Sequence, residues 1–368
     1  MAFAYEGAEK DVAMKRLDRY LISVLLMGTA PVLLLLLGLF GFVTLAEELE
    51  SVGEGRFEDA DALRVALLTL PRIALDLLPV ATLLGGVMAL GGLAAEYELT
   101  AMRAVGMSQW RLAKPLVIGA GLLAGAVMLS QQFVVPYLER DASELRTRKL
   151  AETVHGGEAT EFWTRDGSHF IRVGEVQFGT MPADVEIYDL GPDHKVQSVL
   201  QARAADVLGP GRWRLRDVTE SRIDGTTVTQ VKQTEREWQS FLSPDQMASL
   251  VAPLETLTLS DLYNYVVYLE STGLNAHRYR FRWWQVVSMP VGLLAMCLLG
   301  LPFVLGSVRS RSAGVRILFG ASVGIGFYLS EQTASQLTLL YELPPAPMAL
   351  LPDTVLLTAS VFALTRVD

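Results

Sequence analysis

Charged side chains inside apolar runs are the first residues of this sequence that could do chemistry. Arg72 and Asp76 both fall within the long apolar stretch 64–95, four positions apart. Four positions are about one turn of a helix, so the two side chains can form an ion pair. A charge within a bilayer is costly and usually functional. Two interpretations of Arg72 stay open: a paired or snorkelling side chain, or a cation for an anionic ligand.

Two further arginines, Arg140 and Arg146, lie just beyond the apolar run 116–135 in a charged segment with a helical pattern. They are candidate cations at the same end of the helices as Arg72. A solvated helix face is the competing interpretation, because the acidic residues Glu139, Asp141 and Glu144 are interleaved with them.

The segment 96–114 joins two apolar runs and begins with a short helical pattern that ends at Gly106, a plausible helix C-cap. Such a helix suits docking into a groove of a soluble partner. The alternative is a helix lying on lipid, although its acidic start would be repelled by anionic headgroups. The candidate docking residues are Glu98, Leu99, Met102, Arg103, Val105 and Gly106, of which the three apolar ones fall near one face.

Signals for catalysis and for metal or nucleic-acid binding are missing from the sequence. It has no Walker A motif for ATP and no evident Ser-His-Asp or Cys-His arrangement. Its four histidines and single cysteine lack the spacing of a metal site. The formal net charge of −9 argues against nucleic acid. We therefore expect a chain that is not an enzyme and holds no metal or cofactor.

Helices that span a membrane must position these residues. At 51% hydrophobic and 19% charged, the chain is too apolar for an ordinary soluble protein. A spanning helix needs about 20 residues, and the first run is too long for the core of a signal peptide. We predict six transmembrane helices near 20–46, 64–95, 116–135, 283–305, 315–340 and 349–364.

The distribution of Lys and Arg predicts the orientation of these helices. The basic residues of the N-terminus, of the loops 96–114 and 309–316 and of the C-terminal tail all fall on one side. Both termini are therefore expected in the cytoplasm, and the polar insert outside it. Three basic residues on the other side do not fit this pattern: Arg278, Arg280 and Arg282. They could form a solvated helix face next to the membrane, or they could contact anionic headgroups.

The insert reads as an all-β domain with helical connectors. Strand patterns at 162–165 and 168–173 flank Asp166-Gly167, a strong hairpin signal. Further strand patterns follow at intervals of roughly ten residues, which is typical of a sandwich or jelly roll. An amphipathic helix from Ser260 to near Gly273 leads back to the membrane. The predicted domains are a first membrane half (1–135), a β-jelly-roll domain (136–278) and a second membrane half (279–368).

The order of these parts and several motifs resemble the lipopolysaccharide export permease family. The resemblance covers nearly the whole chain. The residues at Tyr263–Val266 and Arg278-Tyr279 favour the G-type over the F-type branch. The matching motifs are Leu17-Asp18-Arg19-Tyr20, Pro71-Arg72 with Pro79, Glu98 to Gly106, Leu259 to Val266, and Arg278-Tyr279 before Trp284.

The resemblance implies the function and the partners. An F-type (LptF) six-helix permease would form a heterodimer with this chain, along the first predicted span (20–46) and the start of the fifth (315–340). A cytoplasmic ATPase dimer (LptB type) would bind ATP and drive the pair through the segment 98–106. Lipopolysaccharide would be extracted from the bacterial inner membrane and passed through the periplasmic β-jelly roll to bridge proteins. Arg72, Arg140 and Arg146 would bind the substrate; Arg72 and Arg146 match basic positions of the family, whereas Thr44 stands where some relatives carry Lys.

Two other functions stay open at this point. The chain could be a membrane-anchored scaffold or sensor with the β domain as its binding module. It could also be a permease of a lipoprotein-releasing transporter, although such permeases resemble four-helix arrangements and six runs are counted here.

Overall fold

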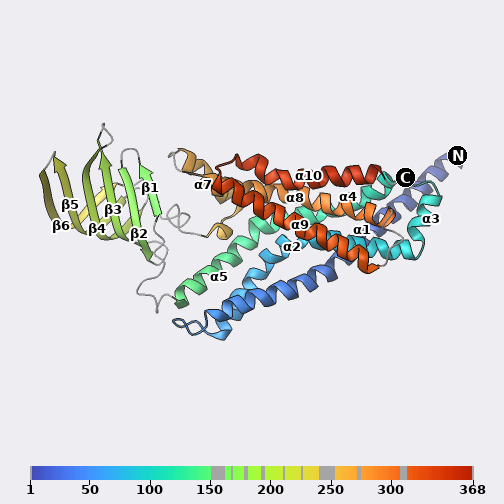
Figure 1. Ribbon diagram of the computed structural model, residues 1–368, viewed down its shortest axis with the longest axis horizontal. Helices are drawn as coiled ribbons and strands as arrows, with labels where there is room; N and C mark the ends of the chain where they lie inside the picture. Colours follow the sequence, from blue (N-terminus) through green and yellow to red (C-terminus); the bar gives the residue numbers. More distant parts are fainter. Residues whose placement is uncertain are drawn as a thin grey trace. The chain divides into compact units, whose positions relative to one another are not determined.

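The computed structural model describes residues 2–150, 162–166, 169–177, 181–191, 195–209, 212–224, 227–239, 253–271, 275–306 and 313–366 (Figure 1). The chain forms two compact units. The first comprises Met1–Gly53, Phe57–Arg146 and Arg280–Asp368, and the second comprises Glu54–Arg56 and Thr147–Tyr279. We call them the helical unit and the β unit.

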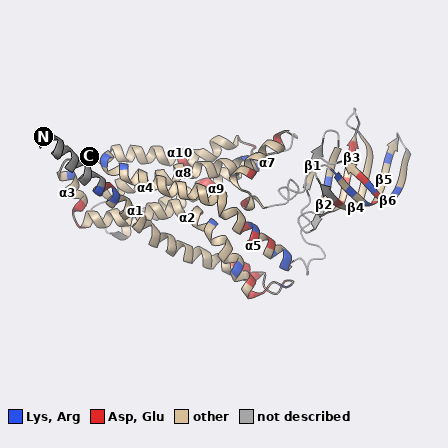
Figure 2. Ribbon diagram, turned by 180° about the vertical axis from the view of Figure 1, so that it is seen from behind, with Lys and Arg blue, Asp and Glu red and all other residues tan. Residues whose placement is uncertain are grey.

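Long helices make up the helical unit. Five are long and apolar enough to cross a membrane, over Arg16–Glu50, Asp59–Ala95, Gln109–Phe133, His277–Leu305 and Pro345–Thr365. Figure 2 shows them mostly in tan, with charged residues gathered towards the helix ends. The helices are α1 (Ala2–Glu50), α2 (Asp59–Ala95), α3 (Glu98–Ala104), α4 (Gln109–Phe133), α5 (Val135–Leu150), α8 (His277–Leu305), α9 (Ala313–Leu340) and α10 (Pro345–Thr365).

The helix α9 corresponds to the fifth predicted span. Its 28 residues are long enough to cross a bilayer, but it is not among the five strongly apolar helices. Arg316, Glu331 and Gln332 dilute its apolar character. It packs against α2 and α10, so that helices from both halves of the chain lie side by side (Figure 1).

Small residues let α1 and α2 approach closely. A Cβ atom on Gly28 would lie 2.6 Å from the Gly85 carbonyl oxygen, and one on Gly85 would lie 2.5 Å from the Thr29 Cα atom. Only glycine allows backbones to meet at such distances, as in helix pairs within membranes. Across the bundle, the buried Cys297 thiol contacts the Leu116 carbonyl at 3.4 Å, which fits the packing role expected for a lone cysteine.

The β unit contains one antiparallel sheet with strand order β1-β2-β3-β4-β5-β6. The hairpin predicted at Asp166-Gly167 is confirmed by the pairing of Asp166 with His169, although Gly167 itself lies outside the described residues. The turn residues Gly156, Gly157, Pro192, Pro210, Gly211, Gly225 and Gly273 also lie outside them. The strands are β1 (Phe162–Asp166), β2 (His169–Gln177), β3 (Met181–Leu190), β4 (Val196–Gly209), β5 (Arg212–Asp224) and β6 (Thr227–Gln239).

The inserted all-β domain is confirmed, but the strand order differs from a jelly roll. A jelly roll is built from Greek keys, in which some sequence neighbours are not sheet neighbours. Here every described strand pairs with the next one in the chain, because short connections leave no room for a strand to cross over. The described part of the domain is therefore a meander, with β4 to β6 longer than the predicted strands.

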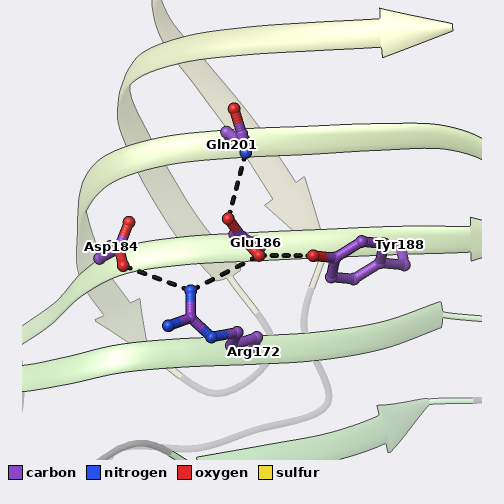
Figure 3. Close-up of polar contacts among 5 residues, drawn as sticks. All are labelled: Arg172, Asp184, Glu186, Tyr188 and Gln201. Carbon is purple, nitrogen blue, oxygen red and sulfur yellow. Dashed lines mark hydrogen bonds and ion pairs between the residues drawn. The ribbon is translucent and has the colours of Figure 1, made fainter. Parts of the chain in front are cut away.

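The sheet has one apolar and one polar face. Buried Ile171, Val173, Val185 and Ile187 line the apolar face with Trp213, and Trp238 and Tyr268 pack against them. On the other face, shown in Figure 3, the Arg172 guanidinium lies 3.4 Å from Asp184 and 3.5 Å from Glu186. The Tyr188 hydroxyl donates to Glu186 at 2.5 Å, and this hydrogen bond raises the pKa of Tyr188. The alternation places charge on one face and core on the other.

The connector α7 (Leu259–Ser271) confirms the predicted amphipathic helix. Its first turn is closed by reciprocal contacts, in which the Thr258 hydroxyl accepts from the Asp261 N–H at 3.1 Å and Asp261 accepts from the Thr258 N–H at 3.4 Å. This is a capping box. The buried residues of α7 are Leu262, Tyr265, Val266 and Leu269.

Candidate functional site

Arg72 lies at the end of the helical unit where α2 meets α5, which we call the α5 end. Its Nε donates to Glu139 on α5 at 2.9 Å, and its Nη1 lies 3.8 Å from Asp76 one turn along α2. Thus Arg72 is shared between two carboxylates, and the ion pair with Asp76 foreseen in the sequence is present. The Arg72 side chain is still 31% exposed, so a ligand could reach it.

Arg146 and Arg140 extend this end along α5. Arg146 Nη1 donates to Glu48 of α1 at 3.1 Å, and 47% of the arginine side chain is exposed while Glu48 is 11% exposed. The Arg140 guanidinium carbon lies 5.8 Å from the ring centroid of Tyr137. Glu139 and Glu48 thereby tie α2 and α1 to α5. The structure brings the three predicted arginines onto two adjoining helices.

This arrangement can exchange anions. A guanidinium bonds carboxylate and phosphate in the same planar fork geometry. An arriving phosphate could therefore take the place of Glu139 or Glu48 without leaving the arginine unpaired. Because Arg72 and Arg146 are partly exposed, their ion pairs are screened and individually weak.

The opposite end of the helical unit, the α3 end, carries the short helix α3. Its C-terminus is closed at Gly106, where φ is +91° and the N–H groups of Gly106 and Met107 donate to the carbonyls of Arg103 and Met102 at 2.9 and 3.2 Å. This is a Schellman motif, in which glycine supplies the left-handed conformation. The predicted end of the helix at Gly106 is confirmed.

The apolar residues of α3 do not share one accessible face. Leu99 is 2% exposed, and it belongs to the main apolar core of the helical unit, against which Met102 also packs. Val105 points outward at 86% exposure, as does Tyr97 at 71%. Thus α3 is anchored through Leu99 and Met102 and presents Val105 to the surroundings. The sequence pattern alone could not separate the anchoring residues from the presented ones.

Two polar contacts bind the first half of α1 to the α3 region. The Tyr20 hydroxyl donates to Glu98 Oε2 at 2.9 Å, and Arg111 Nη1 lies 2.7 Å from Asp18 Oδ1. The acidic Glu98 predicted for docking is therefore tethered to α1 by a phenol hydroxyl and not by a basic side chain. The half-buried Arg103 completes the set of predicted residues on this helix.

Several residues that contact the predicted site residues at the two ends of the helical unit are not evident from the sequence. Tyr20 and Asp18 stand within the motif Leu17-Asp18-Arg19-Tyr20, but nothing in a lone motif shows that they reach across to α3 and α4. The sequence pattern around Glu139 indicates only a solvated helix face, and Glu48 stands near the end of α1 with no local signal of a partner. Their pairing with Arg72 and Arg146 depends on tertiary contacts that no local pattern encodes.

Several charged side chains of the second membrane half lie in different surroundings. Arg282 donates to Gln285 one turn along α8 at 2.9 Å. Glu331 is half-buried within α9. Arg309 and Arg311 lie outside the described residues.

Comparisons with known proteins agree with this architecture. The family model described as lipopolysaccharide export system permease LptF/LptG matches residues 19–366. The chain is similar to the lipopolysaccharide export system permease protein LptG of Haemophilus influenzae, with 30% identity over 95% of this chain and 98% of that protein. It is equally similar to LptG of Escherichia coli K12, with 30% identity over 95% of this chain and 98% of the relative.

Proposed function

Because the chain belongs to the lipopolysaccharide export system permease LptF/LptG family, we propose that it is the transmembrane permease subunit of an ATP-driven exporter of lipopolysaccharide. Its apolar helices and its family make it a multi-pass protein of the inner membrane. The observation that carries the proposal is the match to LptG over almost the full length of both chains. The substrate would be extracted from the inner membrane and passed to a periplasmic bridge.

The α5 end fits recognition of the anionic part of the substrate. Lipopolysaccharide combines phosphorylated sugars with several acyl chains, so its binding requires cations beside an apolar surface. Arg72, Arg140 and Arg146 supply these cations at the ends of apolar helices. Exchange of Glu139 and Glu48 for phosphate would let the substrate enter without exposing an unpaired guanidinium. The half-buried Thr44, at a position where some relatives carry Lys, provides no cation.

The α3 end fits coupling to a cytoplasmic ATPase. Leu99 and Met102 hold α3 on the helical unit, while the acidic Glu98 and the exposed Val105 would meet the partner. Movement of α3 would pass to α1 through Tyr20 and to α4 through the adjoining Schellman turn. In this proposal Arg103 and Gly106 shape the coupling helix, and the ATPase dimer binds ATP while this chain holds no cofactor.

The orientation follows from the same proposal. The termini and α3 would face the cytoplasm, and the β unit would face the periplasm, as the positions of Lys and Arg predict. A second permease of the F type would complete the substrate cavity, with α1 and the start of α9 as the contact surface. The periplasmic bridge proteins would receive the substrate from the β unit.

Affinity purification of the tagged full-length chain from its own membranes tests the assembly. We expect an ATPase and a second six-helix permease to come along, together with bound lipopolysaccharide. Recovery of the chain without any nucleotide-binding partner would contradict the proposal and favour the scaffold or sensor. Recovery of lipoprotein in place of lipopolysaccharide would favour a lipoprotein-releasing permease.

A further inference from the structure

The sheet of the β unit is interrupted along one line that crosses five of the described strands. In each ladder from β2 to β6, one pair of facing residues does not pair, and the register continues unchanged beyond it. These positions join into a single row across the sheet, which we call the crease. Its residues are Gly174, Asp184, Arg203, Asp217 and Thr234.

The backbone leaves the extended conformation at the crease. Asp184 on β3 and Asp217 on β5 both have a φ of +51°, in the left-handed region that residues with a side chain seldom adopt. Gly174 makes room beside them, since a Cβ atom there would lie 2.6 Å from an Asp184 carboxylate oxygen. Because the same conformation recurs in one row on two strands, the crease is a feature of the whole sheet and not of a single strand.

The burial of side chains shows how the strands continue past the crease. Residues three apart on a regular strand point to opposite faces of a sheet. Yet Ala202 and Ala205 on β4 are both buried, as are Leu215 and Val218 on β5, and all four belong to one apolar cluster. The sheet is therefore folded along the crease into two leaves around a shared core. The first leaf comprises 162–173, 185–190, 196–202, 218–224 and 227–233, and the second comprises 175–177, 181–183, 204–209, 212–216 and 235–239.

Two side-chain contacts join the leaves away from the crease. Arg236 of the second leaf donates to Glu220 of the first at 2.6 Å. Glu220 is paired with Val231, and the strand from Val231 to Arg236 would span about 17 Å if it were straight, too far for these side chains to meet. The ring centroids of Trp238 and His169 lie 6.3 Å apart, although their strands, β6 and β2, would be about 19 Å apart in a flat sheet. We call these two contacts the latch.

We propose that the β unit is a clamp whose two leaves open and close about the crease, and that the latch holds them closed. Rotation at the crease breaks no pairing of the described ladders, whereas each leaf is held together by ladders of its own. The ion pair of the latch is weak enough to break and form again, because 35% of the Arg236 side chain is exposed. Opening uncovers the apolar face of the sheet, and closing buries it.

This motion goes beyond the proposed transport function and does not depend on it. A fixed fold is the alternative, in which the crease only lets the sheet enclose its core. The two differ in one observable property: a fixed fold has a single distance between the far ends of the leaves, whereas a clamp has two.

Electron paramagnetic resonance between two spin labels measures this distance. The labels are attached through Val196→Cys at the end of the first leaf and Arg212→Cys at the end of the second, both exposed positions, in the full-length chain with Cys297→Ser. A flat sheet would place the two positions about 40 Å apart. We expect a main population at a clearly shorter distance and a minor one nearer this limit. A single population in all variants would overturn the proposal.

Arg236→Gln removes the ion pair between the leaves. The population at the longer distance should grow by about fivefold, the upper range for a partly exposed ion pair. Arg222→Gln is the matched control, because Arg222 donates to the same Glu220 carboxylate at 3.1 Å but from within the first leaf. This control should keep the wild-type distances. Equal growth of the longer population in both variants would show that the pair between the leaves is not a latch.

Hydrogen exchange distinguishes opening of the clamp from unfolding of the sheet. Leu200 lies in the ladders of the first leaf and Leu215 in those of the second. In Arg236→Gln, the amides of both residues should stay as protected as in wild type, because opening at the crease leaves these ladders intact. Loss of their protection together with the longer distance would show unfolding and overturn the clamp.

Discussion

The two ends of the helical unit hold their charged residues in different ways. At the α5 end, Arg72 and Arg146 are each paired with a carboxylate of another helix, Glu139 or Glu48. At the α3 end, the carboxylate of Glu98 is held by the neutral hydroxyl of Tyr20. The first arrangement balances charge and permits exchange of one anion for another. The second fixes a side chain and leaves its charge for a partner.

This contrast matches two tasks of a permease. In the proposed function the arginines bind and release the substrate many times, and carboxylate partners that are easily replaced would serve that task. In the proposed function α3 transmits force, and its apolar anchor, Leu99, and its fixed end at Gly106 would serve that task. The same bundle can meet both needs because the two ends lie on opposite sides of its apolar helices.

Reversing the charge at the α3 end should have the largest effect. Glu98→Lys replaces the negative group that the ATPase would meet and breaks the contact with Tyr20. Loss of a charge-assisted hydrogen bond to the ATPase would cost about 1.5–3 kcal/mol, about tenfold or more in affinity. We expect the ATPase to be lost on co-purification and transport to stop. Glu96→Lys, an exposed acid just before α3, is the control and should retain the ATPase; unchanged co-purification of Glu98→Lys would refute the coupling role.

Removing the cation at the α5 end should come next. Arg72→Ala should lower crosslinking of lipopolysaccharide to the helical unit by about tenfold, since one charge-assisted contact contributes about 1.5–3 kcal/mol. Glu139→Gln should act in the opposite direction, because it releases Arg72 from its competing carboxylate. Arg64→Ala removes a charge from an exposed position on the same helix as a control. Equal labelling of wild type and Arg72→Ala would remove Arg72 from the site.

Removing the Tyr20 hydroxyl should have a smaller effect. This variant distinguishes binding of the ATPase from the transmission of its movement to α1. Tyr20→Phe keeps the ring and removes one hydrogen bond, which contributes about 1 kcal/mol. We expect the ATPase to stay bound while the lipopolysaccharide released per ATP hydrolysed falls about fivefold. Tyr328→Phe, an exposed tyrosine on α9, should leave this ratio unchanged. A normal ratio in Tyr20→Phe would show that α3 does not act through α1.

The β unit offers ion pairs that are structural, and they should give the smallest effect. Burial would raise the pKa of Glu220, but hydrogen bonds from Arg236 at 2.6 Å and Arg222 at 3.1 Å lower it overall. The resulting stability is present above the unfolded pKa and is lost as the pH falls through the lower folded value.

Glu220→Gln should therefore move the acid midpoint of strand circular dichroism in the full chain by only a few tenths of a pH unit. The variant no longer loses this ion pair when acid is added, so its unfolding should depend less steeply on pH than that of wild type. Glu237→Gln on β6 is the control. A wild-type steepness in Glu220→Gln would show that the pairs contribute nothing.

The sequence predicted the features that local patterns determine, and it did not predict the contacts between residues that are far apart in the chain. Long apolar runs predicted the spanning helices, and Asp166-Gly167 predicted the β1–β2 hairpin, because both signals are local. The turn signals predicted an all-β domain but not its strand order, since they do not distinguish a meander from a jelly roll.

The same limit holds for the candidate site. The spacing of Arg72 and Asp76 revealed one ion pair within a helix, whereas Glu139 and Glu48 reach their arginines from other helices.

ATP-driven release of lipopolysaccharide from proteoliposomes tests the central claim most directly. The vesicles would hold this chain, the second permease and the ATPase, with a soluble periplasmic acceptor outside. We predict release that requires ATP and this chain and that is strongly reduced by Arg72→Ala and abolished by Glu98→Lys. Release that continues without this chain, or that proceeds equally in both variants, would contradict the account.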